Sequence, residues 1–339
     1  MKENIQHYYG TLASRSNLRD LAGYYDDNLQ DYIRKIKSNI HPKILLKHYG
    51  CGSPIPLELR DKTVLELGCG SGVHSFVLSK LVGSEGKVIG IGMTREQIEL
   101  ADNYIYYHQK AFRYEKPNMS FILGDSENFD DLCNIPAGSV DVVVSNCILN
   151  FAADKERVFN NILRLLVPGG ECQLSGIFVD RRLPEKVINN PLLYAECIGG
   201  AMYFEDFRRI LHSCGVANFR TMFSETRKIV NPHLQTILGD ANLTYSTVRF
   251  FKLDLDDKCE NYGHVAKYKG GIEFSKDIFI LDDNYCFEKG VLVPVCRNTA
   301  KMLSKTRFAK YFEVFSNNGE QHCGLEHRVL LRDLTHRAK

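Results

Sequence analysis

The sequence Val64-Leu65-Glu66-Leu67-Gly68-Cys69-Gly70-Ser71-Gly72 joins an apolar segment to a turn that contains three glycines. The apolar half predicts a buried strand, and the residues after the turn, 73–81, carry apolar side chains at helical spacing. Glycines let backbone N–H groups approach a ligand where a Cβ atom would collide. A strand, a glycine turn and a helix in this order therefore predict a crevice that holds a nucleotide-type cofactor.

Composition limits the class of protein. The chain has 339 residues, 44% of them hydrophobic, with 43 basic and 41 acidic side chains. This balance argues against nucleic-acid or anionic-membrane binding. No apolar run reaches membrane-spanning length, and residues 1–9 lack the apolar core of a signal peptide, so we expect a cytosolic protein without membrane attachment. The 11 cysteines contain no C-x-x-C pair, so most are expected to be buried thiols.

The chain divides into three predicted regions. Residues 1–60 are expected to form a helical cap and lid, with a polar helix at Asp26–Ser38 and a Gly/Pro-rich loop at 49–56. Residues 61–219 are expected to form the cofactor-binding core, and residues 220–339 a small α+β accessory domain. Short strands are predicted in this last region at 246–253, 265–268, 278–281 and 291–295, with a turn at Gly270-Gly271.

Strands and helices alternate in the predicted core. Strands are expected at 87–92, 120–123, 140–145 and 171–175, and helices at 94–109 and 155–166, the latter capped by Asp154 and ended by Pro168-Gly169-Gly170. This alternation predicts an α/β fold, a Rossmann-like parallel sheet with helices on both faces.

The glycine spacing and the nearby acid indicate which cofactor the crevice holds. The turn reads G-x-G-x-G, whereas dinucleotide sites read G-x-G-x-x-G. Glu66 would repel a pyrophosphate but attract the ammonium and sulfonium groups of S-adenosylmethionine. Together with Gly124-Asp125-Ser126 and Asn146-Cys147 at strand ends, residues 60–180 resemble class I S-adenosylmethionine-dependent methyltransferases. The expected cofactor contacts are Glu66, Gly68, Gly70, Gly72, Met93, Thr94, Asp125, Ser126 and Asn146.

One position departs from that pattern. The acid that normally binds the ribose hydroxyls at the end of the second strand is replaced by Gly92. A lost acceptor should weaken cofactor binding by roughly 1.5–3 kcal/mol if nothing replaces it. We expect a water molecule or another residue such as Glu96 to take its place; a different ribose position, or a degenerate protein that binds the cofactor poorly, are the alternatives.

Segments beyond the core resemble the arsenite methyltransferase family. They are Tyr8-Tyr9-Gly10, Tyr49-Gly50-Cys51-Gly52, Leu81-Val82-Gly83, Ser145-Asn146-Cys147-Ile148-Leu149-Asn150, Glu196-Cys197-Ile198-Gly199-Gly200-Ala201 and Lys269-Gly270-Gly271-Ile272. The resemblance covers most of the chain. It implies transfer of a methyl group to a small soft nucleophile, with Cys147, Asn146 and Cys51 as the catalytic residues. Tyr8 and Tyr9 would either close over the cofactor or dock the N-terminal helix.

The cysteines match the family incompletely. Cys51 and Cys147 coincide with family cysteines, but residues 20–25 contain none, and Ala217 stands where a partner of Cys147 is expected. Cys214 and Cys197 are the remaining candidates for a second thiol. Trivalent arsenic needs two or three converging thiolates. The acceptor is therefore either arsenic or another small thiol or amine metabolite; a cofactor-binding pseudoenzyme and an NAD-dependent oxidoreductase are the other classes considered.

Overall fold

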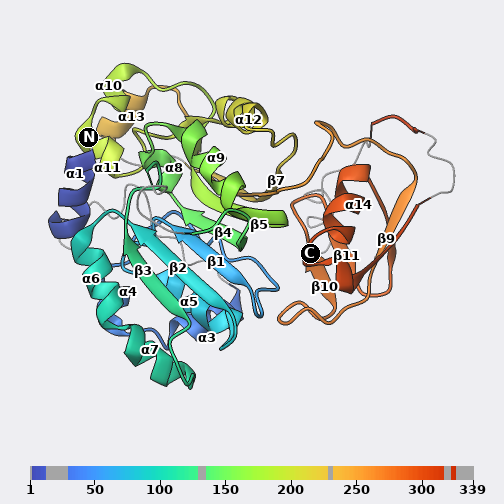
Figure 1. Cartoon of the computed structure of the whole chain (residues 1–339). Helices are drawn as coiled ribbons and strands as arrows, with labels where there is room; N and C mark the ends of the chain where they lie inside the picture. The colour runs from blue at the N-terminus through green and yellow to red at the C-terminus, as the bar shows by residue number, and fades with distance from the viewer. Residues whose placement is uncertain (1, 13–29, 129–134, 228–231, 317–321, 326–339) are drawn as a thin grey trace.

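A twisted eight-stranded sheet forms the centre of the protein (Figure 1). The computed structural model describes residues 2–12, 30–128, 135–227, 232–316 and 322–325. The strand order is β3-β2-β1-β4-β5-β8-β7, with β6 paired to β5. The strands of this sheet are β1 (Thr63–Leu67), β2 (Lys87–Gly92), β3 (Met119–Leu123), β4 (Val140–Asn146), β5 (Leu166–Val179), β6 (Met202–Tyr203), β7 (Arg220–Arg227) and β8 (Leu243–Phe251).

Strands β1 to β5 run parallel, and both faces of this part of the sheet are buried. Val64 pairs with Val88 and Val142, and all three join one apolar core. Their neighbours Leu65, Ile89 and Val143 are paired in the same way and join the core on the opposite face. Because successive strand side chains point to opposite faces, a sheet covered on both sides has continuously apolar strands.

Helices cover both faces, as the sequence predicts. Side chains of α3, α4, α5 and α7 pack into one core, and those of α9 and α12 pack into the other. The helices that precede or follow the parallel strands are α5 (Val73–Val82), α6 (Arg95–Asn103), α7 (Ile105–Phe112), α8 (Ile148–Phe151), α9 (Lys155–Leu165), α10 (Glu185–Ile188), α11 (Pro191–Ala195), α12 (Phe204–Ser213) and α13 (Pro232–Leu238).

Local boundaries differ slightly from expectation. The helix expected at 94–109 is two helices, which meet at Tyr104. The fifth strand is longer than expected because it takes in the predicted Pro168-Gly169-Gly170 stop and pairs along its length with β4 and β8. Asp154 caps α9 as predicted, since its Oδ1 accepts a hydrogen bond from the Arg157 N–H at 2.9 Å.

The N-terminal region is a cap of short helices. It contains α1 (Lys2–His7), the π-helical turn η1 (Tyr8–Leu12), α3 (Asp31–Lys37) and α4 (Pro42–Leu45). Helix α1 lies beside α6 and α11 in Figure 1. The expected helix at 26–38 begins at Asp31 in the described part of the chain; its first residues, 26–29, and the segment 20–25 lie outside the described residues.

Strands β7 and β8 lie beyond the expected domain boundary at residues 219/220, yet both belong to the central sheet. β8 pairs with β5 over nine residues, from Glu171–Phe251 to Val179–Leu243, and β7 pairs with β8. We infer that the accessory domain begins after Phe251. The regular alternation of strands and long helices stops near residue 220, before the central sheet ends. The reason is that antiparallel strands such as β7 and β8 need no long crossover between them.

The remaining C-terminal residues form a small α+β domain with an apolar core of its own, drawn in orange in Figure 1. It contains β9 (His264–Tyr268), β10 (Ile278–Ile280), β11 (Cys286–Glu288), β12 (Leu292–Val295), α14 (Arg297–Ser304), η2 (Ala309–Tyr311) and β13 (Phe312–Phe315). The strand orders are β12-β9-β13 and β10-β11. Within the described residues, no helix combines the length and apolar character that crossing a bilayer requires.

Candidate active site

The three glycines of the turn after β1 adopt the left-handed conformation. Gly68, Gly70 and Gly72 all have positive φ angles, of 75°, 52° and 88°. A Cβ atom at Gly68 would lie 3.0 Å from Ile148 Cδ1, and one at Gly72 would lie 2.8 Å from Phe121 Cζ. Both the left-handed conformation and the lack of space require glycine here.

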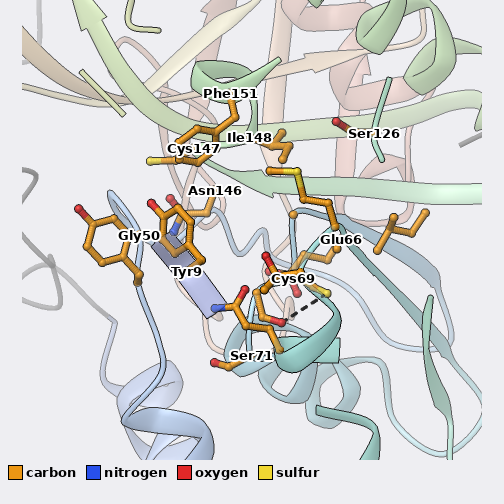
Figure 2. Close-up of a pocket in the computed structure, with 18 of the residues that line it drawn as sticks. Tyr9, Gly50, Glu66, Cys69, Ser71, Ser126, Asn146, Cys147, Ile148 and Phe151 are labelled. Carbon is orange, nitrogen blue, oxygen red and sulfur yellow. Dashed lines mark hydrogen bonds between the residues drawn. The ribbon is translucent and has the colours of Figure 1, made fainter. Parts of the chain in front are cut away.

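A pocket opens at the carboxyl ends of β1, β2, β3 and β4, the edge at which open α/β sheets bind ligands. Its walls include nearly all the expected cofactor contacts, namely Glu66, Gly68, Gly70, Met93, Thr94, Asp125, Ser126 and Asn146. Gly72 is not in the wall and instead begins α5. Figure 2 shows Glu66 and Cys69 on one side of the pocket and Tyr9 and Cys147 on another.

Glu66 is an almost fully buried acid in this wall. Its carboxylate accepts a short hydrogen bond from Ser75 and lies 3.5 Å from His74 Nδ1. His74 is itself buried and packs edge-on against His48, so it does not face solvent. Burial lowers the pKa of His48 well below its usual range, which keeps that imidazole neutral. Glu66 therefore presents a carboxylate to the pocket from a fixed position.

Gly92 ends β2, where an acid that binds the ribose was expected, and it lines the pocket. A Cβ atom there would lie 3.1 Å from Ile98 Cδ1 and 3.4 Å from Cys69 Sγ. Glu96, the expected substitute, is exposed and is not among the lining residues. Gln97 does line the pocket, next to the glycine turn. The side chain near the expected ribose position is therefore an amide on the first turn of α6.

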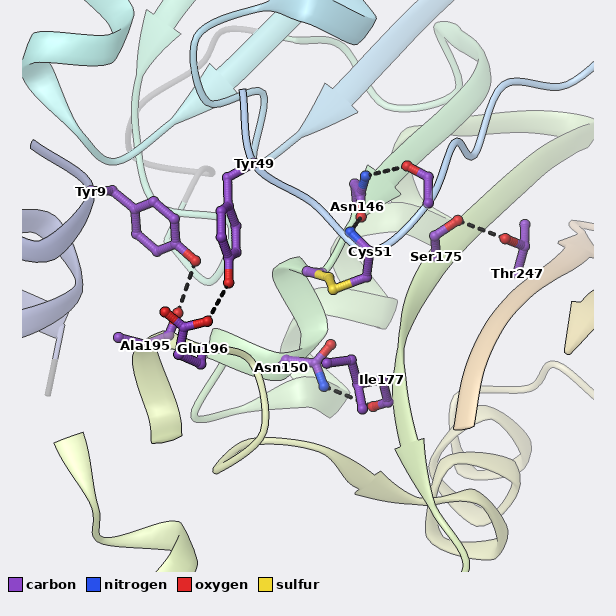
Figure 3. The surroundings of a disulfide bond; sticks show 12 residues. Tyr9, Tyr49, Cys51, Asn146, Asn150, Ser175, Ile177, Ala195, Glu196 and Thr247 are labelled. Carbon is purple, nitrogen blue, oxygen red and sulfur yellow. Dashed lines mark hydrogen bonds between the residues drawn. A yellow bond between two sulfur atoms is a disulfide. The ribbon is translucent and has the colours of Figure 1, made fainter. Parts of the chain in front are cut away.

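Three cysteine sulfurs converge beside the pocket. The Sγ atoms of Cys51, Cys147 and Cys197 all lie within 4.8 Å of one another, and all three residues are buried. Cys51 and Cys147 are joined as a disulfide, with a Cα–Cα distance of 6.3 Å (Figure 3). Cys147 lines the pocket, whereas Cys51 and Cys197 do not.

Of the two candidates left for a second thiol, Cys197 and Cys214, Cys197 joins Cys147. It lies in the Glu-Cys-x-Gly-Gly-Ala segment that follows α11. Cys214 ends α12 and contacts the Glu156 carbonyl of α9, so it is not part of the cluster. The distinctive segment around Cys197 was therefore the sequence feature that could have identified the third cysteine of the cluster.

Asn146 holds the Cys51 loop against the end of β4. Its Oδ1 accepts from the Cys51 N–H at 2.9 Å, and its Nδ2 donates to the Gly52 carbonyl at 2.6 Å (Figure 3). A Cβ atom at Gly50 would lie 2.4 Å from Asn146 Nδ2. The loop can therefore lie this close to the Asn146 side chain only because residue 50 is glycine. Asn146 thus touches both the pocket and the thiol cluster.

A buried acid and three tyrosines close the other side of the cluster. Tyr8 donates a short hydrogen bond to Glu196, and Tyr49 donates to the same carboxylate at 2.5 Å. Tyr9 donates to the Ala195 carbonyl at 2.8 Å and lines the pocket. Burial raises the pKa of Glu196, and burial together with Glu196 raises the pKa of the Cys197 thiol. Tyr8 and Tyr9 therefore dock the N-terminal segment, and Tyr9 also lines the pocket.

Comparisons with known proteins agree with this geometry. Residues 59–227 match the methyltransferase domain family, and residues 262–333 match the arsenite methyltransferase C-terminal domain. The arsenite methyltransferase of Aquipseudomonas alcaligenes is 38% identical over 96% of this chain and 93% of its own length. That of Mus musculus is 33% identical over 98% of this chain and 89% of its own length.

A solved structure is similar over both domains. The crystal structure of an arsenic(III) S-adenosylmethionine methyltransferase from Chlamydomonas reinhardtii has a TM-score of 0.83 and 36% sequence identity, and the match covers 87% of this chain and 98% of that one. The expected Rossmann-like fold, cofactor, small-molecule acceptor and enzyme class are thereby confirmed. The chain belongs to the arsenite methyltransferase family and is an S-adenosylmethionine-dependent methyltransferase.

Proposed function

We propose that this enzyme methylates trivalent arsenic, held as a substrate by Cys51, Cys147 and Cys197. The observation that supports this most directly is the convergence of three buried sulfurs within 4.8 Å. Thiolates are soft ligands, and a soft trivalent centre prefers them to the hydroxyls it carries in water. Three ligands satisfy that centre and leave its lone pair free to attack.

The cysteines must be reduced before they bind arsenic. Two molecules of a small thiol such as glutathione reduce the Cys51–Cys147 disulfide, yielding two protein thiols and one small disulfide. Three thiols then replace three hydroxyls on As(OH)₃, releasing three water molecules. Because burial raises the pKa of Cys197, its proton is lost to the departing hydroxyl rather than to bulk water. Of the three cysteines, Cys147 would carry the acceptor closest to the cofactor pocket, which it lines.

We propose the cofactor contacts from the residues that fit the group. The open glycine cradle at Gly68 and Gly70 and the buried carboxylate of Glu66 suit an amino-acid end with a positive charge. Asp125 and Ser126 would contact adenine, which Met93 would flank. When bound, S-adenosylmethionine supplies an electrophilic methyl carbon on a sulfonium, and neutral S-adenosylhomocysteine is left. Tyr9 and the 47–50 segment would exclude water from the transfer path.

The proposal includes a reducing compartment and a small acceptor. Three thiolates persist only where small thiols keep cysteines reduced, so we infer that the enzyme works in the cytosol. Its formal net charge of +2 gives no electrostatic support for nucleic acid as a partner.

Cys197→Ser, compared with Cys214→Ser, tests the arsenic proposal. Both changes remove one thiol, but only Cys197 belongs to the cluster. With arsenite, glutathione and S-adenosylmethionine, we expect Cys197→Ser to lower methylarsenic formation by about tenfold or more, as loss of 1.4 kcal/mol would. Cys214→Ser should retain activity. Mass spectrometry measures the products, and calorimetry with S-adenosylhomocysteine confirms that the pocket is intact in both variants.

The acceptor itself can be tested in the same assay. A panel of small thiols and amines replaces arsenite in parallel wells. Methylation of one of these compounds, with none of arsenite, would overturn the arsenic proposal while leaving the methyltransferase class intact. Tight S-adenosylhomocysteine binding without turnover of any acceptor would instead favour a cofactor-binding pseudoenzyme.

A further inference from the structure

A second pair of cysteines lies in the C-terminal domain, away from the methyl-transfer pocket. Cys296 precedes α14 and is fully buried, and Cys259 lies in the segment before β9 and is half-buried. The segments that carry the two cysteines lie side by side: the Arg297 N–H donates to the Glu260 carbonyl at 2.9 Å, and Asn298 Nδ2 donates to the Lys258 carbonyl at 3.2 Å. Neither Cys259 nor Cys296 lines the pocket or belongs to the cluster of Cys51, Cys147 and Cys197. The proposed arsenic chemistry makes no use of this pair.

The surroundings of Cys296 are built to hold a sulfur anion. Its Sγ accepts a hydrogen bond from the backbone N–H of Thr299 at 3.4 Å and lies 3.2 Å from the Thr299 hydroxyl. Arg220 Nη2 donates to the same sulfur at 3.5 Å. The first turn of an eight-residue helix and a buried guanidinium both favour negative charge there.

The charged and titratable groups facing this sulfur come from four elements or segments. They are Arg220 on β7, Asp282 after β10, Tyr285 before β11 and Cys259. The hydrogen bond from Cys259 and the charge of Arg220 lower the pKa of Cys296, and they outweigh the opposite effect of burial. By contrast, burial raises the pKa of Cys286 on β11. One thiol of this domain is therefore activated, and a neighbouring one is not.

Arg220 connects this pair to the central sheet. It belongs to β7 and lies 3.6 Å from Asp282 of the C-terminal domain, while its Nη2 also reaches Thr299 at 3.0 Å. A buried cation between the two domains thus contacts both the Asp282 carboxyl group and the Cys296 sulfur. A metal ion would be repelled by this guanidinium, whereas an anionic nucleophile is stabilised by it.

We propose that Cys259 and Cys296 form a redox-active pair that hydrogen peroxide converts to a disulfide. The Cys296 thiolate attacks one peroxide oxygen, the O–O bond breaks, and hydroxide leaves and is protonated to water. Cys259 then attacks the resulting sulfenic sulfur, giving the disulfide and a second water molecule. Two thiols and one peroxide thus yield one disulfide and two waters. The thiolate charge beside Arg220 disappears in this step.

Oxidation of the reduced full-length enzyme, followed by mass spectrometry, tests the proposal. Hydrogen peroxide is added in steps, remaining thiols are blocked, and Cys259, Cys296 and Cys286 are quantified from peptides. We expect a Cys259–Cys296 linked peptide to appear at peroxide doses at least about tenfold below those that modify Cys286. In Cys259→Ser, Cys296 should stop at sulfenic acid, which dimedone traps. Oxidation of Cys286 at the same or lower dose, with Cys296 still a thiol, would overturn the proposal.

A second measurement needs no variant. The oxidation rate of a group that is already a thiolate should change little between pH 6 and 8, whereas that of Cys286 should rise about tenfold per pH unit. Parallel slopes for the two cysteines would contradict an activated Cys296. Both outcomes are read from thiol labelling and do not depend on the identity of the methyl acceptor.

Discussion

Two cysteines of the sulfur cluster have a backbone conformation that side chains seldom adopt. Cys147 has a φ angle of 60° and Cys197 one of 65°. A left-handed residue other than glycine costs roughly 1–2 kcal/mol, so the rest of the fold must impose it. The contacts that hold Cys147 in this conformation include the hydrogen bond from its N–H to the Ser175 carbonyl at 2.7 Å. The glycine turn after β1 could be recognised from local sequence, but left-handed cysteines could not, because they depend on contacts made across the fold.

Gly68→Val should abolish cofactor binding. A Cβ atom at Gly68 would lie 3.0 Å from Ile148 and the φ angle is 75°, so valine combines backbone strain with a collision in the pocket wall. Gly138→Val is the matched control, because Gly138 has a φ angle of 64° and no atom of the described residues lies within 4 Å of the added Cβ. Calorimetry with S-adenosylhomocysteine should detect binding only to the control; equal affinities would show that the turn does not contact the cofactor.

Gly92→Asp should tighten cofactor binding. A carboxylate at the end of β2 would supply the acceptor that the ribose lacks, and such a hydrogen bond contributes about 1.5–3 kcal/mol, or roughly ten- to hundredfold in affinity. The new Cβ would approach Ile98 Cδ1 to 3.1 Å, so Gly92→Asp combined with Ile98→Val relieves the crowding. Unchanged or weaker affinity in both variants would mean that the ribose lies elsewhere in the pocket.

At the scale of elements, the site depends on how one loop is held against one strand end. The loop that carries Cys51 is attached to β4 through both polar atoms of Asn146. The strands themselves could be predicted because their apolar runs and flanking turns are local signals. The loop's attachment could not, because Cys51 and Asn146 are separated by 95 residues and only the folded sheet brings them together.

Asn146→Ala should raise the arsenite KM by about tenfold. Two hydrogen bonds of about 1 kcal/mol each are lost, which frees the loop and lowers the fraction of enzyme with three converging sulfurs. Asn161→Ala on α9 is the control, since the Asn161 side-chain nitrogen has no hydrogen-bond partner among the described residues. Steady-state kinetics with arsenite measures the change; an unaltered KM would show that Asn146 does not position the loop.

At the scale of the whole molecule, three buried charges join the sheet to the C-terminal domain. Glu171 on β5 lies 2.6 Å from Arg249 Nη2 and 2.5 Å from Arg307 Nη1. Arg249 also donates to the Leu281 carbonyl at 2.8 Å, and Arg307 donates to the Leu57 carbonyl at 2.9 Å. One carboxylate therefore connects the core sheet, the accessory domain and the N-terminal loop.

Glu171→Gln should destabilise the folded protein by about 3–5 kcal/mol. The change removes the counter-charge that two buried guanidinium groups share, which is costlier than losing an exposed pair. Asp206→Asn, which removes a surface partner of Arg182 and Arg209, should cost less than about 1 kcal/mol. Urea unfolding at neutral pH compares the two variants; a similar loss for both would mean that the buried triad does not stabilise the domain contact.

The same triad gives the wild-type protein an acid-dependent stability. Burial raises the pKa of Glu171, but Arg249 and Arg307 outweigh it, so the pKa lies below its usual value. A carboxyl group whose pKa is lower in the folded than in the unfolded protein stabilises the fold at pH values above its unfolded-state pKa. This stabilisation is lost as the pH falls through the folded-state pKa. The wild-type protein should therefore lose stability in this acidic range more steeply than Glu171→Gln does.

The sequence by itself determined the local features of this protein. The strand, glycine turn and helix at 64–81, the parallel α/β core and the Asp154 cap follow from signals carried by neighbouring residues, and family segments extend the resemblance to most of the chain. Only the tertiary structure decided that Cys197 completes the sulfur cluster, that β7 and β8 join the central sheet, and that Gln97 rather than Glu96 faces the pocket. The physical reason is range: propensity and periodicity act over a few residues, whereas a three-sulfur cluster joins residues up to 146 positions apart through the packing of the sheet.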